Sequence, residues 1–171
     1  QLRKIVKETK QYEKISVYTI DEIYKETPLP VQSKCNPGDA SNINKWTENE
    51  RMKQEEWQKK FIEPLESVFN NLLNKGKSNS SPIMEMIQAI SIAAFQSNFS
   101  QIGKKLFIFS DMIQNSSEYS HYKDSPQFRD FYKSPKYLKL RTNLKDVAVQ
   151  IFYVRRPGSE GIQGKAHAEF W

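Results

Sequence analysis

The stretch that most constrains the fold of this chain is residues 80–111, SSPIMEMIQAISIAAFQSNFSQIGKKLFIFSD. Ser81 is a favourable N-cap, and Pro82 suits the first position of a helix, where no backbone donor is needed. From residue 83 to 95 the apolar side chains cover almost the whole circumference of a helix. The pattern therefore predicts a helix that is buried on most sides.

The second half of this stretch predicts a strand. Leu106–Phe109 is a continuous apolar run without alternation, which is typical of a strand covered on both faces. Ser110 and Asp111 follow at its carboxyl end. A helix that begins with a hydroxyl and a central strand that ends in a carboxylate are typical of α/β folds, which bind ligands at the carboxyl ends of their strands.

The rest of the chain continues the alternation of strands and helices. The patterns predict, in order, a helix over 2–12, a strand over 14–21, an antiparallel edge strand over 31–35, a helix begun by the capping box at 47–50 and kinked or divided at Pro64, short helices at 126–132 and 137–144, a buried strand over 147–154 and the start of a helix at 167–171. This order predicts a mostly parallel sheet with right-handed crossovers.

We therefore predict one α/β domain over residues 1–171. Its sheet is doubly wound, mostly parallel and Rossmann-like, with one antiparallel edge strand and helices on both faces. Residues 39–75 form a helical insertion. Three or four strands make a thin sheet for this length, so we expect a first strand upstream of Gln1.

Composition narrows the class of protein. The chain is 37% hydrophobic and 12% aromatic, which is globular, and no apolar run approaches the roughly 20 residues that cross a bilayer. An upstream membrane anchor stays open. The net charge is +6, but the lysines are scattered among Glu and Gln, so a solvated basic surface is favoured over a nucleic-acid site.

The single cysteine and the two histidines give no catalytic pattern. Cys35 has no Cys/His/Asn constellation around it, which leaves a disulfide to an upstream cysteine or a buried free thiol. His121 has no second histidine nearby in the sequence, and His167 is far away, so we expect His121 to be a solvated loop residue. The chain has no Gly-x-Ser-x-Gly, phosphate loop or Gly-x-Gly-x-x-Gly, which disfavours a hydrolase or nucleotide-binding enzyme.

Three segments resemble the von Willebrand factor A (VWA) family. The helix start at 80–87 resembles the family's hydroxyl-Pro-Leu-x-x-Ala-Ile, residues 106–111 resemble its strand ending in Thr/Ser-Asp-Gly, and 147–153 resemble its next strand. With the Cys-Asn-Pro-Gly at 35–38 and the Arg-Arg-Pro-Gly at 155–158, the pattern also resembles a group of poorly characterised bacterial VWA-like proteins. Met112 departs from the family, which has Gly after the Asp.

The resemblance implies a Rossmann-like domain and, in many members, a metal-ion-dependent adhesion site at the carboxyl edge of the sheet. Ser81 takes the family's Thr position and Asp111 its last Asp, so both are expected as ligands of Mg²⁺, which prefers hard oxygen ligands. The family's Asp-x-Ser-x-Ser run is missing here, and we expect the remaining ligands upstream of Gln1.

The resemblance implies a non-enzymatic domain that binds a protein partner, with Mg²⁺ as part of the contact. It also hints at a bacterial envelope or secretion-linked setting, although the sequence itself fixes no compartment. The alternative is a basic nucleic-acid-binding α/β module. Its basis is the run from Tyr132 to Arg141, in which aromatic side chains that could stack on bases lie among cations that could neutralise phosphates.

Overall fold

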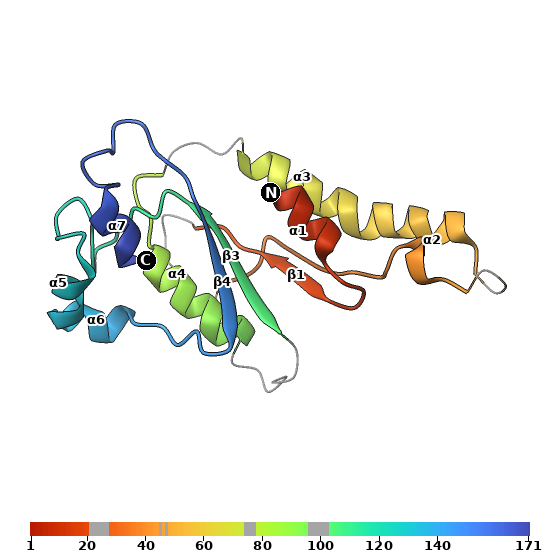
Figure 1. Ribbon diagram of the computed structural model, residues 1–171, viewed down its shortest axis with the longest axis horizontal. Helices are drawn as coiled ribbons and strands as arrows, with labels where there is room; N and C mark the ends of the chain where they lie inside the picture. The colour runs from red at the N-terminus through yellow and green to blue at the C-terminus, as the bar shows by residue number, and fades with distance from the viewer. Residues whose placement is uncertain (21–27, 45, 47, 74–77, 96–102) are drawn as a thin grey trace. The chain divides into compact units, whose positions relative to one another are not determined.

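The computed structural model describes residues 1–20, 28–44, 46, 48–73, 78–95 and 103–171 (Figure 1). The chain divides into two compact units. Unit 1 comprises residues 1–19 and 29–77, and unit 2 comprises residues 20–28 and 78–171. The prediction of a single domain over 1–171 stays a prediction, because two compact units can belong to one domain or to two.

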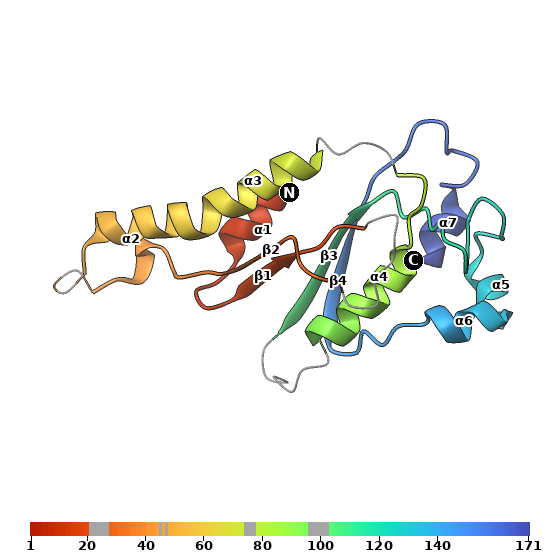
Figure 2. The ribbon, with the colours of Figure 1, turned by 180° about the vertical axis from the view of Figure 1, so that it is seen from behind.

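Unit 1 contains an antiparallel strand pair and helices. It contains α1 (Leu2–Glu8), β1 (Lys14–Val17), β2 (Gln32–Cys35), a short 3₁₀ turn η1 (Ala40–Asn42), α2 (Glu50–Trp57), a π-helical segment η2 (Gln58–Ile62) and α3 (Glu63–Leu73). β1 and β2 pair antiparallel, as predicted, and both strands are labelled in Figure 2. The core of the unit consists of Val6, Phe61, Ile62 and Leu65, with Ile15, Val17, Trp57 and Phe69 packed against it. Trp57 and Phe61 thus belong to the core.

The sequence predicted that Pro64 kinks or divides the helix. The helix is not divided at the proline, so that alternative is wrong, and a kink stays a prediction. A proline in a helix leaves the carbonyl of residue i−4, here Lys60, without its donor and crowds it. The backbone adopts the wider π geometry over Gln58–Ile62, just before Pro64, and then continues as α3. The start of α2 also differs, because Asn49 is the N-cap and accepts a hydrogen bond from Met52 N (3.1 Å).

Unit 2 contains a parallel strand pair and helices. Its elements are α4 (Ile83–Ile90), a π-helical segment η3 (Ser91–Phe95), β3 (Lys104–Ser110), α5 (Phe128–Lys133), α6 (Pro135–Leu140), β4 (Val147–Tyr153) and α7 (Lys165–Phe170). β3 and β4 pair in register from Lys104↔Val147 to Ser110↔Tyr153. Ile83 and Ile87 of α4 pack with residues on one sheet face: Leu106, Ile108, Ile151 and Tyr153.

The opposite face of the β3–β4 pair differs from the prediction. Phe109 stacks on Phe152 with ring centroids 4.3 Å apart, yet Phe109 remains 38% exposed. Ala148 and Gln150 of β4, which alternate onto the same face as Phe109 and Phe152, are also exposed. The expectation that both strands are buried on both faces is therefore wrong for the part of the chain that the structure describes.

The α/β class is confirmed. The predicted doubly wound architecture of the sheet is not confirmed. In the described ranges the strands form one antiparallel pair and one parallel pair. A full doubly wound sheet with helices on both faces stays a prediction. Within the same ranges, each helix falls short of the length and hydrophobicity needed for a bilayer crossing.

Candidate functional site

The turn after β3 positions Asp111. Ser110 Oγ accepts a hydrogen bond from Met112 N (3.0 Å), and Asp111 Oδ1 accepts one from Ile113 N (3.0 Å). Met112 between them has φ +57°, the left-handed conformation that favours glycine, and its side chain is fully buried. The residue that stands at the family's Gly position thus adopts a glycine-like conformation and is held there by core packing.

Ser81 does not cap α4, and this prediction is wrong. Ser81 forms an isolated β-bridge in which its N–H donates to the Asn115 carbonyl (2.8 Å) and its carbonyl accepts from Asn115 N (3.0 Å). Gln114, from the adjacent residue of that segment, supplies the cap instead, because its Oε1 accepts from Met84 N (2.9 Å). The bridge therefore brings the start of α4 to the segment that follows Asp111.

The Asp111 carboxylate already faces a positive charge. Arg156 NH1 lies 3.5 Å from Asp111 Oδ2 and 3.3 Å from the Tyr122 hydroxyl, to which it donates. A guanidinium beside the carboxylate disfavours a second cation there. The described ranges hold no group of three His, Cys, Asp or Glu side chains that could hold a metal. The prediction that Asp111 and Ser81 are ligands of Mg²⁺, with the remaining ligands upstream of Gln1, stays a prediction.

Gln163 joins the carboxyl ends of the two strands. Its Nε2 donates to the carbonyls of Asp111 and Val154 (both 2.9 Å), and its Oε1 accepts from Arg156 N (2.7 Å). The side chain is buried, and these three bonds use both of its N–H donors and one lone pair of its carbonyl oxygen. Gln163 therefore fixes the backbone from which Arg155 and Arg156 project. The sequence analysis missed this residue, because a lone Gln in a Gly-rich segment gives no signal.

A small hollow of about 150 Å³ lies at the carboxyl end of β4. Its lining residues are Arg155, Arg156, Pro157, Glu160 and Gln163. Arg155 NH1 donates to the Gln163 carbonyl (3.3 Å), and Glu160 Oε1 accepts from Gly158 N (3.1 Å). Ligand pockets for metabolites and cofactors usually measure about 300–1,000 Å³, so this hollow suits a single small group.

The two histidines meet in the core, which corrects the prediction of a solvated His121. His121 is 3% exposed and His167 is fully buried, with His167 Nε2 3.0 Å from His121 Nδ1. Gln114 N also donates to His121 Nδ1 (3.2 Å), so this nitrogen is an acceptor and His167 Nε2 carries the proton. His167 Nδ1 then accepts from the Tyr153 hydroxyl (2.7 Å). The two histidines are 46 positions apart in the sequence, which hid this pairing from sequence reasoning.

Burial sets the protonation of this chain of hydrogen bonds. Desolvation, with repulsion from His167, lowers the pKa of His121 to about 4, against the opposing effect of Asp124. Desolvation also lowers the pKa of His167 and raises the pKa of Tyr153. The histidines are neutral at pH 7, and His121 Nε2 is buried without a partner among the described residues. We interpret the cluster as part of the core.

Comparison with known proteins finds no match to a family model, a curated protein or a solved structure. The VWA-like interpretation therefore rests on the sequence segments quoted above.

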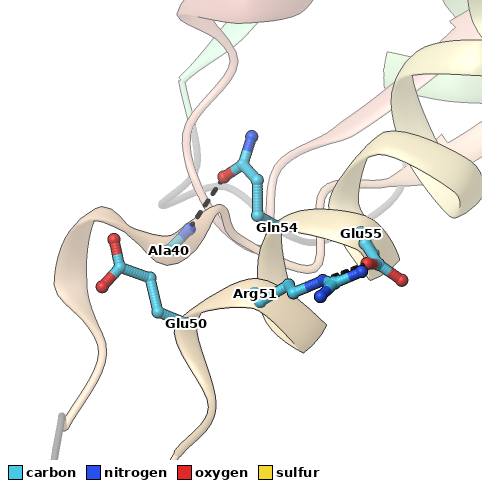
Figure 3. Close-up of a pocket in the computed structure, with 5 residues that line it drawn as sticks. All are labelled: Ala40, Glu50, Arg51, Gln54 and Glu55. Atoms are coloured by element: carbon cyan, nitrogen blue, oxygen red, sulfur yellow. Dashed lines mark hydrogen bonds and ion pairs between the residues drawn. The ribbon is translucent and has the colours of Figure 1, made fainter.

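A second hollow, of about 520 Å³, lies on unit 1 (Figure 3). It is lined by Ala40, Glu50, Arg51, Gln54 and Glu55. Arg51 Nε pairs with Glu55 Oε1 at 3.0 Å, one turn along α2, and both side chains are well exposed. This is a solvated helix surface with an ordinary i,i+4 ion pair, and it contains no predicted site residue.

Cys35 is an exposed free thiol at the end of β2. The alternative of a buried thiol is wrong. The alternative of a disulfide to an upstream cysteine stays a prediction.

Proposed function

We propose that the chain is a VWA-like, non-enzymatic protein-interaction module that contacts its partner at the carboxyl end of β3 and β4. The observation that carries the proposal is the charged surface at this end, where Asp111, Arg155 and Arg156 project from backbone held by Gln163. Charged side chains on a fixed backbone favour recognition, because little conformational freedom is lost on binding.

The position of the potential proton carriers supports a contact surface over a reaction centre. His121 and His167 are buried and bonded to each other and to Tyr153. A general base must reach its substrate directly or through one water, and these imidazoles lie in the core. The surface beside them carries guanidinium and carboxylate groups.

The divalent cation implied by the VWA resemblance is a separable part of the proposal. The contact that we propose uses the Arg156–Asp111 pair as it stands in this chain. A cation would require further ligands and the release of Arg156 from Asp111.

Site-specific photo-crosslinking tests the proposed function. Lys123 is exposed and adjoins Tyr122, the partner of Arg156, whereas Lys145 is exposed just before β4, at the amino end of the strand. With benzoylphenylalanine in place of each lysine in cells that make the protein, we expect a discrete protein adduct from position 123 and none from 145. Equal adducts from both positions, or none from 123, would contradict the proposal.

Nucleic-acid binding is the second candidate, and one observation favours it. Phe128 and Tyr132 on α5 are 46% and 57% exposed, with Lys133 exposed beside them. Two cations of the predicted run are already paired, Lys136 with Asp124 (2.9 Å) and Lys139 with Glu118 (3.0 Å). This pairing reduces the positive charge available to phosphates, which is why we place this function second.

A gel-shift assay with single-stranded oligonucleotides at two salt concentrations tests this second candidate. If it is correct, Tyr132→Ala weakens binding, whereas Tyr12→Ala, which removes an exposed tyrosine from unit 1, does not. No binding at low salt would dispose of it.

A further inference from the structure

The hollow at the carboxyl end of β4 has a guanidinium without an acidic partner. Arg155 uses one N–H for the Gln163 carbonyl, and in the part of the chain that the structure describes no carboxylate pairs with it. We infer that this hollow receives one carboxylate side chain of a partner protein, bound by the free edge of the Arg155 guanidinium. The inference rests on the proposed function and specifies the chemistry of the contact.

The loop that forms the hollow is ordered by its own hydrogen bonds. Ser159 N donates to the Arg156 carbonyl (3.1 Å), and Gln163 N donates to the Ser159 carbonyl (2.9 Å). Gly158 has φ +83°, which allows the reversal between them. Together with the Gln163 side chain, these bonds fix the backbone on both sides of Arg155. The guanidinium of Arg155 is exposed and donates to the Gln163 carbonyl (3.3 Å), and its planar fork carries parallel N–H donors that match a carboxylate in a two-bond geometry.

The charges around the hollow favour a carboxylate over a phosphate. Arg156 is already paired with Asp111, which is not a lining residue, and Glu160 places one carboxylate in the lining itself. The pKa of Glu160 is lowered by its hydrogen bonds to its own backbone and to Gly158, so this side chain is ionised at pH 7. Glu160 repels a phosphate group with a charge of about −1.5 to −2 more strongly than it repels a single carboxylate, and the one free guanidinium of Arg155 matches the single charge of a carboxylate.

The size of the hollow points to the tip of a side chain. A volume of about 150 Å³ accommodates a carboxylate with its methylene group, and is half the lower end of the usual range for pockets that enclose whole metabolites. The rest of the bound molecule must lie outside on the surface, as it does when a protein partner inserts one acidic residue.

The test is an NMR titration of the full chain with a blocked glycyl-aspartyl-glycine peptide, its asparaginyl counterpart and inorganic phosphate. We expect the aspartyl peptide to shift the Arg155 Nε–H and the Gln163 amide signals in a saturable way, and the asparaginyl peptide not to. Arg155→Gln should weaken binding about tenfold, the usual effect of losing a charge-assisted pair. Arg141→Gln, which makes the same change at an exposed site on the amino side of β4, should leave it unchanged.

Each other outcome overturns the inference. Equal shifts with the asparaginyl peptide would show that charge is not recognised, and tighter binding of phosphate would assign the hollow to a phosphate ligand. Unchanged binding by Arg155→Gln would place the contact elsewhere. The outcome is separable from the proposed function, because a crosslinked partner at position 123 with no aspartyl-peptide binding would leave the module intact and refute only this inference.

Discussion

We expect the protein to lose stability as the pH falls from about 6.5 to about 4, because His121 must gain a proton in a buried position. Its pKa is lowered from 6.5 to about 4, mainly by desolvation and by the adjacent His167, with Asp124 acting in the opposite direction. The unfolded chain therefore binds the proton at a higher pH than the folded chain does. The stabilisation from neutral His121 is present above pH 6.5 and is lost as the pH falls through that window.

The size of this effect follows from the same pKa values. A pKa lowered from 6.5 to about 4 corresponds to about 3 kcal/mol of unfolding free energy at about 1.4 kcal/mol per pKa unit. His121 Nε2 already carries a proton, so the added proton must go to Nδ1. Nδ1 accepts hydrogen bonds from His167 Nε2 and Gln114 N, while His167 Nδ1 accepts from the Tyr153 hydroxyl. Protonation of His121 therefore breaks hydrogen bonds in the core. A domain of ordinary stability, about 5–15 kcal/mol, would lose a substantial fraction of it.

Urea unfolding of the wild type and His121→Asn at pH 7.5, 6.5, 5.5 and 4.5 measures this loss. The asparagine carbonyl can replace Nδ1 as an acceptor but does not titrate in this range. We expect the variant to be less stable than the wild type at pH 7.5, and the difference to shrink as the pH falls. Acidic groups far from His121 titrate alike in both proteins, so their contribution cancels in the comparison, whereas Asp124 interacts with His121 and does not cancel fully.

The reasoning is refuted if the difference between the two proteins is the same at every pH. It is also refuted if an NMR titration finds the pKa of His121 near 6.5, because the ring would then be solvated and the His121–His167 contact absent.

Three further predictions concern the carboxyl end of β3 and β4. Gln163→Leu leaves the carbonyls of Asp111 and Val154 without their donor and should destabilise the protein by about 2–4 kcal/mol in urea unfolding, whereas Gln150→Leu at an exposed position of β4 should change it by less than about 0.5 kcal/mol. Met112→Gly relieves the strain of a left-handed backbone, about 1–2 kcal/mol, but removes a fully buried side chain, which costs about 2–5 kcal/mol. Thermal unfolding should therefore show a net loss of stability. A gain in stability would mean that the side chain contributes little to the core. Millimolar Mg²⁺ should leave the melting temperature of this chain unchanged, because Arg156 occupies the Asp111 carboxylate, and a saturable increase that Asp111→Ala abolishes would contradict this.

The elements with strong local patterns were predictable from the sequence. The apolar run before Asp111 predicted β3, and the apolar residues before Arg155 predicted β4. The antiparallel pairing predicted for residues 31–35 was confirmed. These signals are local, because strand formation and turn chemistry depend on neighbouring residues. The Ser81 cap was wrong because a backbone bridge to a segment 34 residues away took precedence over local helix-capping chemistry.

The candidate site was predictable only in part, because its contacts join distant segments. Asp111 could be singled out by its place after an apolar strand. Arg156, Gln163 and the pairing of His121 with His167 could not, since no local spacing connects them. Polar residues whose partners lie far along the chain look like solvated loop residues until the tertiary structure is known.

The hydrogen bonds of Gln163 also bear on the order of events during folding. Its amide joins a residue 52 positions earlier, at the end of β3, to the end of β4, so these bonds can form only after the two strands have paired. The loop with Arg155 and Arg156 is therefore expected to be among the last parts to order and the first to be released on unfolding. A partner that recognises this loop would distinguish the fully folded chain from its folding intermediates.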